Sequence, residues 1–165
     1  MEKNNVQTTE LEIFHLGGGG QNSSFFFQRD DTSVTVDAVE DALQPLQLFV
    51  DEHLERCGCD KRIRLDIRLA VEEIFVNICT YAYPAMEGTT RITCEVVEDT
   101  SFIQLIFSDS GIPFDPLKKK ADTSEQHFVK HEGGYGIHLV QNMMDEVTYE
   151  YRDGKNILKV KRFLA

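Results

Sequence analysis

The stretch between Asp60 and Pro84 constrains the fold most, because it predicts one long amphipathic helix. Aspartate is a preferred N-cap residue, and a proline disfavours helical conformation in the residue before it. We therefore expect a helix from Asp60 to about Tyr83. Apolar residues recur on it at helical spacing along two flanks. One flank comprises Ile67, Val71, Ile74 and Ile78, and the other comprises Leu65, Leu69 and Val76.

Shorter patterns surround this helix. Alternating or continuous apolar runs predict strands, periodic runs predict two further helices, and Asp153-Gly154 predicts a hairpin turn. The expected strands are residues 33–36, 91–97, 102–107, 147–151 and 157–163, and the expected helices are residues 46–57, ending at Gly58, and 136–144. The polar residues 112–132 predict a long loop. This order predicts an α+β fold, a two-layer sandwich with helices on one face of a mixed, mostly antiparallel sheet.

Residues 1–31 have a different character from the rest. They contain four consecutive glycines, residues 17–20, which are typical of a flexible linker. The apolar residues 11–14 could add one edge strand. We expect a flexible N-terminal extension at residues 1–31 and one domain at residues 32–165.

Charge and cysteine content narrow the functional classes. The formal net charge of −11 disfavours direct binding to nucleic acid or to an acidic membrane surface. A nucleotide would therefore be held locally, by backbone N–H groups and a metal ion. The four cysteines have neither zinc-site nor disulfide-framework spacing, and no apolar run is long enough for a membrane span. We expect reduced thiols and a cytoplasmic protein.

Glu73 and Asn77 are the most informative pair on the long helix. They lie four residues apart, about 40° around the helix, on a line between the two apolar flanks. A carboxylate there can orient or deprotonate a hydroxyl, and the amide oxygen can join the ligands of Mg²⁺. The same pair also occurs on ordinary solvated helix faces.

Two glycine-containing turns follow. Asp109 ends an apolar strand, and Gly111 lets the chain approach a ligand, so the carboxylate can accept a hydrogen bond from an exocyclic amine such as that of adenine. The same residues also form common strand-ending turns. Residues 133–136 lead into a helix, where backbone N–H groups favour an anion, although they also suit a glycine-rich hinge. We interpret His138 as a helix-face residue.

Together these motifs resemble those of the GHKL (histidine-kinase-like) ATPase superfamily. They are E-x-x-x-N on a helix, D-x-G-x-P after a strand and G-G-x-G opening a helix. Within the superfamily the chain most resembles the anti-sigma-factor serine/threonine kinases, over roughly residues 33–163. Tyr135 stands where those kinases often carry a basic or small residue.

The resemblance implies a Bergerat-type ATP-binding fold and a role for each matched position. Glu73 matches the catalytic base, and Asn77 matches the residue that binds Mg²⁺. Asp109 matches the residue that reads the adenine amino group of ATP or ADP. The other matched nucleotide-binding positions are Gly111, Pro113, Gly133, Gly134, Tyr135 and Gly136, under a mobile lid at about residues 117–132.

The implied function is transfer of the ATP γ-phosphate to a serine or threonine of an anti-sigma antagonist protein, together with sequestration of a sigma factor. A transcription regulator of this kind is often a homodimer. The alternative is a nucleotide-gated protein-binding module without kinase activity.

Overall fold

The computed structural model describes residues 25–81, 90–118 and 135–165. The strands are β1 (Phe27–Arg29), β2 (Ser33–Asp37), β3 (Arg91–Glu98), β4 (Phe102–Asp109), β5 (Glu146–Arg152) and β6 (Lys155–Phe163). The α-helices are α1 (Leu43–Cys57), α2 (Lys61–Tyr81) and α3 (Tyr135–Met143), and two short 3₁₀ helices are η1 (Glu40–Ala42) and η2 (Pro116–Lys118).

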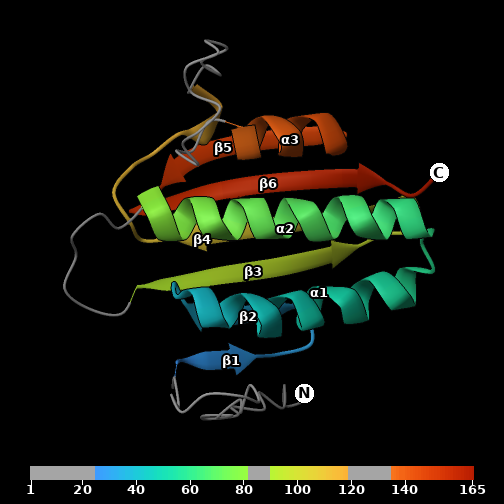
Figure 1. Ribbon diagram of the computed structural model, residues 1–165, viewed down its shortest axis with the longest axis horizontal. Helices are drawn as coiled ribbons and strands as arrows, with labels where there is room; N and C mark the ends of the chain where they lie inside the picture. Colours follow the sequence, from blue (N-terminus) through green and yellow to red (C-terminus); the bar gives the residue numbers. More distant parts are fainter. Residues whose placement is uncertain (1–24, 82–89, 119–134) are drawn as a thin grey trace, which may run out of the picture.

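The strands form one open sheet in the order β1-β2-β3-β4-β6-β5. Figure 1 shows α1 and α2 side by side across one face of this sheet, with α3 next to α2. The predicted α+β, two-layer architecture is therefore confirmed. The expectation of a mixed sheet is wrong for the described strands, because all five pairings between them are antiparallel. Hairpins join β3 to β4 and β5 to β6, and a hairpin can join only antiparallel strands.

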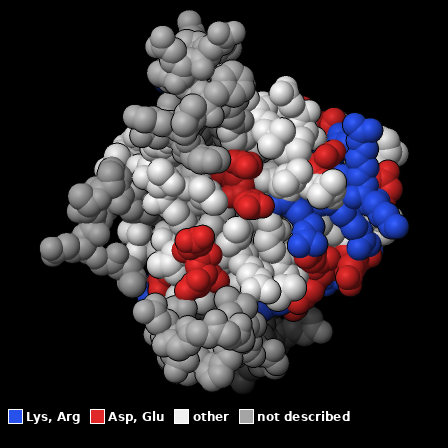
Figure 2. Space-filling model, in the orientation of Figure 1, with Lys and Arg blue, Asp and Glu red and all other residues white. Residues whose placement is uncertain are grey.

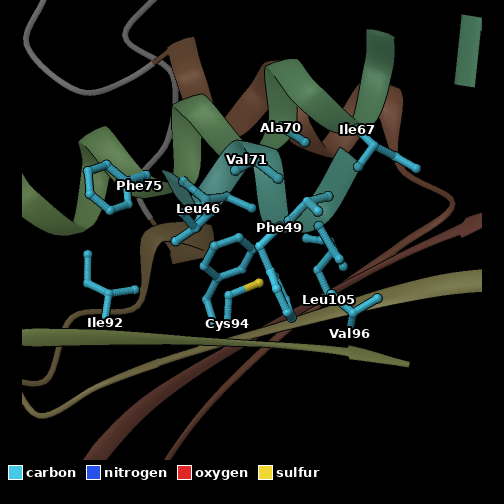
Figure 3. Close-up of a cluster of buried hydrophobic side chains, with 14 of the residues drawn as sticks. Leu46, Phe49, Ile67, Ala70, Val71, Phe75, Ile92, Cys94, Val96 and Leu105 are labelled. Atoms are coloured by element: carbon cyan, nitrogen blue, oxygen red, sulfur yellow. The ribbon is translucent and has the colours of Figure 1, made fainter. Parts of the chain in front are cut away.

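One side of α2 forms the centre of the core. Ile67, Val71 and Ile74 of the first predicted flank are at most 1% exposed. Figure 3 shows side chains of α1 and α2 packed against Ile92 and Cys94 of the sheet. The second flank behaves differently: Leu65 and Val76, for example, are 58% and 48% exposed. The two apolar flanks of the sequence are thus one core face and one solvent-facing stripe.

The boundaries of the long helices have local causes. Asp60 Oδ1 accepts a hydrogen bond of 2.9 Å from Ile63 N, as an N-cap residue does. Gly58 ends α1 in the left-handed conformation, with φ at 63°. The first helix begins at Leu43 rather than residue 46, because Pro45 fits within the first turn, where its missing N–H is not needed.

The C-terminal predictions are close to the observed elements. Asp153 and Gly154 both have positive φ, 53° and 76°, which suits the two-residue turn between β5 and β6. Helix α3 begins and ends one residue earlier than expected. The predicted loop at residues 112–132 includes η2, and its residues from 119 onward lie outside the described part.

Residues 1–31 contain the edge strand β1, whereas the strand expected at residues 11–14 lies outside the described residues and stays a prediction. Phe25 is buried, and Phe26 N donates a hydrogen bond of 2.8 Å to Asp37 Oδ2. The sheet therefore includes residues 27–29, which lie on the N-terminal side of the predicted domain boundary. The division at residue 31 stays a prediction.

All four cysteines are described and unpaired. Burial raises the pKa of Cys79 to about 11, which keeps this thiol protonated near neutral pH. In the described part of the chain, no helix has the length and apolar character to cross a membrane.

Replacing Asp60 by alanine removes the N-cap of α2. We expect Asp60→Ala to lower the free energy of unfolding by about 1 kcal/mol. Urea denaturation followed by circular dichroism measures this, with the exposed Asp31→Ala as the control. An equal effect of both substitutions would contradict a capping role.

Candidate functional site

Glu73 and Asn77 lie one turn apart on α2, at the border between its buried and exposed sides. Both residues are half-buried, as the sequence predicts. Their neighbours Ile74 and Ile78 are in the core, so the rotation of α2 about its axis is fixed. The pair therefore occupies a defined position beside the core instead of a solvated face.

The first turn of α3 packs directly against Glu73. A Cβ atom added to Gly136 would overlap Glu73 Oε2 and lie 3.3 Å from Glu73 Cδ. A side chain at residue 136 would displace the Glu73 carboxylate, so glycine allows this close approach. It also places the carboxylate at the N-terminal end of a helix, where the helix dipole favours negative charge.

Asp109 is the last residue of β4, and its side chain is fixed by hydrogen bonds. It is 5% exposed, and its Oδ1 accepts bonds from Gly111 N at 2.9 Å and from Asn156 Nδ2 at 3.0 Å. Gly111 is buried and Pro113 is exposed. The turn after β4 is therefore built on the Asp109 carboxylate.

Asn156 connects this turn to the sheet. It lies opposite Asp109 in the β4–β6 pairing and is 6% exposed. Besides Asp109, its Nδ2 donates to Ile112 O at 2.9 Å, and its Oδ1 accepts from Phe114 N at 3.0 Å. One buried amide thus holds the turn at both ends.

Aromatic rings enclose the same region. Tyr149 Oη donates a hydrogen bond of 2.5 Å to Asn156 Oδ1. The pKa of the Tyr149 hydroxyl is raised, mainly by its partial burial. The Phe114 ring stacks on Tyr81 of α2, with centroids 5.5 Å apart and an angle of 16° between the planes. These contacts join the end of α2 to the turn after β4.

Asn77 and Asp109 line one small cavity between α2 and the sheet. The other lining residues are Ile74, Ile78, Phe107, Phe114, Pro116, Tyr149, Asn156 and Leu158. Its volume of about 30 Å³ is room for about one water molecule. Small-molecule sites are typically about 300–1,000 Å³. Among the described residues, this cavity by itself is therefore too small to hold a nucleotide base.

The structure brings most of the predicted site residues together around α2. Asn77 shares a cavity with Asp109, and Glu73 contacts Gly136. Tyr135 is the first residue of α3, and His138 is a half-buried residue of that helix, as expected. The positions of Gly133 and Gly134, and the predicted lid beyond Lys118, lie outside the described residues.

Asn77 is the predicted metal ligand. Among the described residues, no group of three or more His, Cys, Asp or Glu side chains could hold a metal ion. The amide oxygen of Asn77 fits Mg²⁺ in the way that is usual for nucleotide sites. There one or two protein oxygens bind the ion, and phosphate oxygens and water supply its other ligands.

Asn156, Tyr149 and Tyr81 were not identified from the sequence. Asn156 lies beside the predicted 153–154 turn, where an asparagine is ordinary. Its burial and its bonds to Asp109 follow from the pairing of β4 with β6, strands far apart in the sequence. No local pattern in the sequence predicts that pairing.

Comparison with known proteins identifies a family and several relatives. Residues 36–162 match the family described as the histidine kinase-like ATPase domain. The chain is 28% identical over 141 residues to the serine-protein kinase RsbW of Staphylococcus aureus strains RF122 and Newman. These matches cover 81% of this chain and 87% of each relative.

The fold is also found in a solved structure. The RsbU and RsbW domains of Rv1364c from Mycobacterium tuberculosis match with a TM-score of 0.51 and 15% sequence identity. The match covers 79% of this chain and 32% of that longer chain. At this identity the match supports the fold alone.

Substitution of Asn156 tests the buried hydrogen-bond network. Asn156→Ala leaves Phe114 N and Tyr149 Oη without the Asn156 acceptor and removes one of the donors to Asp109, so we expect the free energy of unfolding to fall by about 1–3 kcal/mol. Chemical denaturation measures the loss, with the exposed Asn142→Ala of α3 as the matched control. A difference of less than about 0.5 kcal/mol between the two variants would contradict this role.

Proposed function

Because the chain belongs to the histidine kinase-like ATPase domain family, we propose that it binds ATP with Mg²⁺ and transfers the γ-phosphate to a serine or threonine of an anti-sigma antagonist protein. We further propose that it sequesters a sigma factor. The relatives named serine-protein kinase support this class of reaction. The proposed protein is a cytoplasmic transcription regulator, which is compatible with its four unpaired cysteines.

The observation that supports the proposal most directly is the convergence of separate segments on α2. Asn77 faces the cavity beneath Asp109, and Glu73 lies against the first turn of α3. The residues that we propose for base recognition, metal binding, proton acceptance and phosphate binding thus lie on α2 or beside it. Phosphoryl transfer needs mainly such positioning and charge neutralisation.

Each residue has a role in this proposal. Asp109, held by Gly111 and Asn156, accepts a hydrogen bond from the adenine amino group. The backbone of Gly133, Gly134, Tyr135 and Gly136 contacts the phosphates, and Pro113 borders the base. Asn77 holds Mg²⁺, which would neutralise charge on the phosphates when bound.

Glu73 is the proposed base. Its carboxylate accepts the proton of the serine or threonine hydroxyl as that oxygen bonds to the γ-phosphorus and ADP leaves. The contact with Gly136 keeps this carboxylate at the N-terminus of α3, close to where the phosphates would lie. The same packing would restrict its rotamers.

Nucleotide binding is tested by replacing the base-recognising carboxylate. We expect saturating Mg-ATP or Mg-ADP at about 100 times Kd to stabilise the wild type by about 2.7 kcal/mol. Asp109→Asn should weaken binding at least about tenfold, because an amide NH₂ would face the adenine amino group. A thermal-shift titration measures both, with the exposed Asp31→Asn, in the turn between β1 and β2, as the control. Unchanged affinity in Asp109→Asn would remove this residue from base recognition.

Phosphoryl transfer is tested separately. With radiolabelled ATP and an antagonist encoded near this gene, we expect Glu73→Gln to reduce transfer by about 10²–10⁴-fold. ADP affinity should change little, because the substitution preserves side-chain size. The exposed Glu55→Gln of α1 is the matched control. Normal transfer in Glu73→Gln would exclude the base role. Nucleotide binding without any transfer by the wild type would favour the binding module without kinase activity.

A further inference from the structure

The exposed flank of α2 forms one wall of a groove, and α1 forms the other. Leu65, Leu69 and Glu72 follow one another at helical spacing along α2. Leu43, Gln44 and Gln47 face them from the N-terminal half of α1. The groove has a volume of about 580 Å³, which is within the range of binding sites.

The floor of the groove is fixed by contacts between the two helices. Gln47 Nε2 donates a hydrogen bond of 2.7 Å to Arg68 O, which ties α1 to α2. The Arg68 guanidinium lies 3.5 Å from Asp51 Oδ2. This groove therefore has a defined shape, and its one arginine is already paired with a carboxylate.

Apolar exposure in the groove is larger than folding requires. Leu65, which lines the groove, is 58% exposed, and Leu43 and Leu69, which also line it, are half-buried. Single exposed apolar residues are common, but three leucines with accessible surface along one groove are typical of a surface that contacts another molecule. A groove between two helices suits an amphipathic helix, whose apolar anchors recur every three or four residues.

The charges beside the groove select the partner. Glu40, Asp41 and Glu72 line it, whereas Arg68 is paired with Asp51. Figure 2 shows acidic groups beside the uncharged surface near the centre of this face. Most of the Lys and Arg side chains on the face are grouped at its right end. A chain of net charge −11 would also attract a basic segment over longer distances.

We infer that the α1–α2 groove binds an amphipathic helix of a partner protein, which inserts leucine-like side chains between Leu43, Leu65 and Leu69 and places lysine or arginine beside Glu40, Asp41 and Glu72. This inference is independent of nucleotide binding. Glu72 in the groove is next to Glu73, so a helix bound there lies beside the proposed phosphoryl-transfer site. The groove thereby supplies a recognition surface separate from the residues that would contact ATP.

Fluorescence anisotropy with the full chain tests the groove. The probe is a fluorescein-labelled synthetic helix of about 18 residues, roughly 27 Å long, with leucines every three or four residues and lysines beside them. A second probe has each lysine replaced by glutamate. We expect the lysine probe to bind at least about tenfold more tightly than the glutamate probe, and more weakly as salt increases.

Two variants locate the binding. Leu65→Asn should raise the Kd of the lysine probe at least about tenfold, since an apolar anchor loses its contact. The double variant Asp41→Asn/Glu72→Gln should raise it about threefold or more and reduce the salt dependence. The matched controls are Leu139→Asn, at an exposed position of α3, and Asp153→Asn, and neither should change the Kd. Thermal melts verify that each variant is folded.

Three results would overturn the inference. The first is equal binding of the lysine and glutamate probes, or no binding of either. The second is a Kd unchanged by Leu65→Asn. The third is conversion of a dimer to a monomer by Leu65→Asn in sedimentation velocity, which would make a second copy of the chain the occupant of the groove.

Discussion

The burial of one side of α2 against the sheet is the constraint on which the rest of the structure depends. Ile67, Val71 and Ile74 are almost fully buried, and each such side chain contributes about 1.5–3 kcal/mol relative to exposure. A rotation of α2 would expose them, so the helix has one stable orientation. That orientation places Glu73 and Asn77 at the edge of the core, and it turns Leu65 outward into the groove with α1.

At the end of β4, a buried polar network fixes the position of Asp109. Pairing of β4 with β6 sets Asn156 opposite Asp109. The Asn156 amide then forms hydrogen bonds with Ile112 O and Phe114 N in the turn after β4. Without these bonds the two backbone groups would be unpaired, which is costly in an apolar environment. The carboxylate that resembles an adenine-reading residue is therefore held by a side chain from a distant strand.

Much of the fold could be predicted from local chemistry. Asp60, Gly58 and the Asp153-Gly154 pair set boundaries through capping and turn geometry that involve only a few neighbouring residues. The edge strand β1 could not be predicted, because its three residues gain their hydrogen bonds only by pairing with β2. The long helix was predicted with both its apolar flanks. Periodicity, however, does not distinguish a flank that packs on a sheet from a flank that faces solvent. Leu65 and Ile67 differ in burial for a reason that lies outside α2.

The sequence by itself determined the element types, the order of the motifs, and the residue chemistry at Glu73, Asn77 and Asp109, because these depend on side-chain type and near-neighbour spacing. Only the tertiary structure decided which of these residues meet. The contact between Gly136 and Glu73, the cavity shared by Asn77 and Asp109, and the network around Asn156 all join segments that are distant along the chain. Such contacts form when the sheet and helices bury a common core, since strand pairing and helix packing have no signature in the spacing of any single segment.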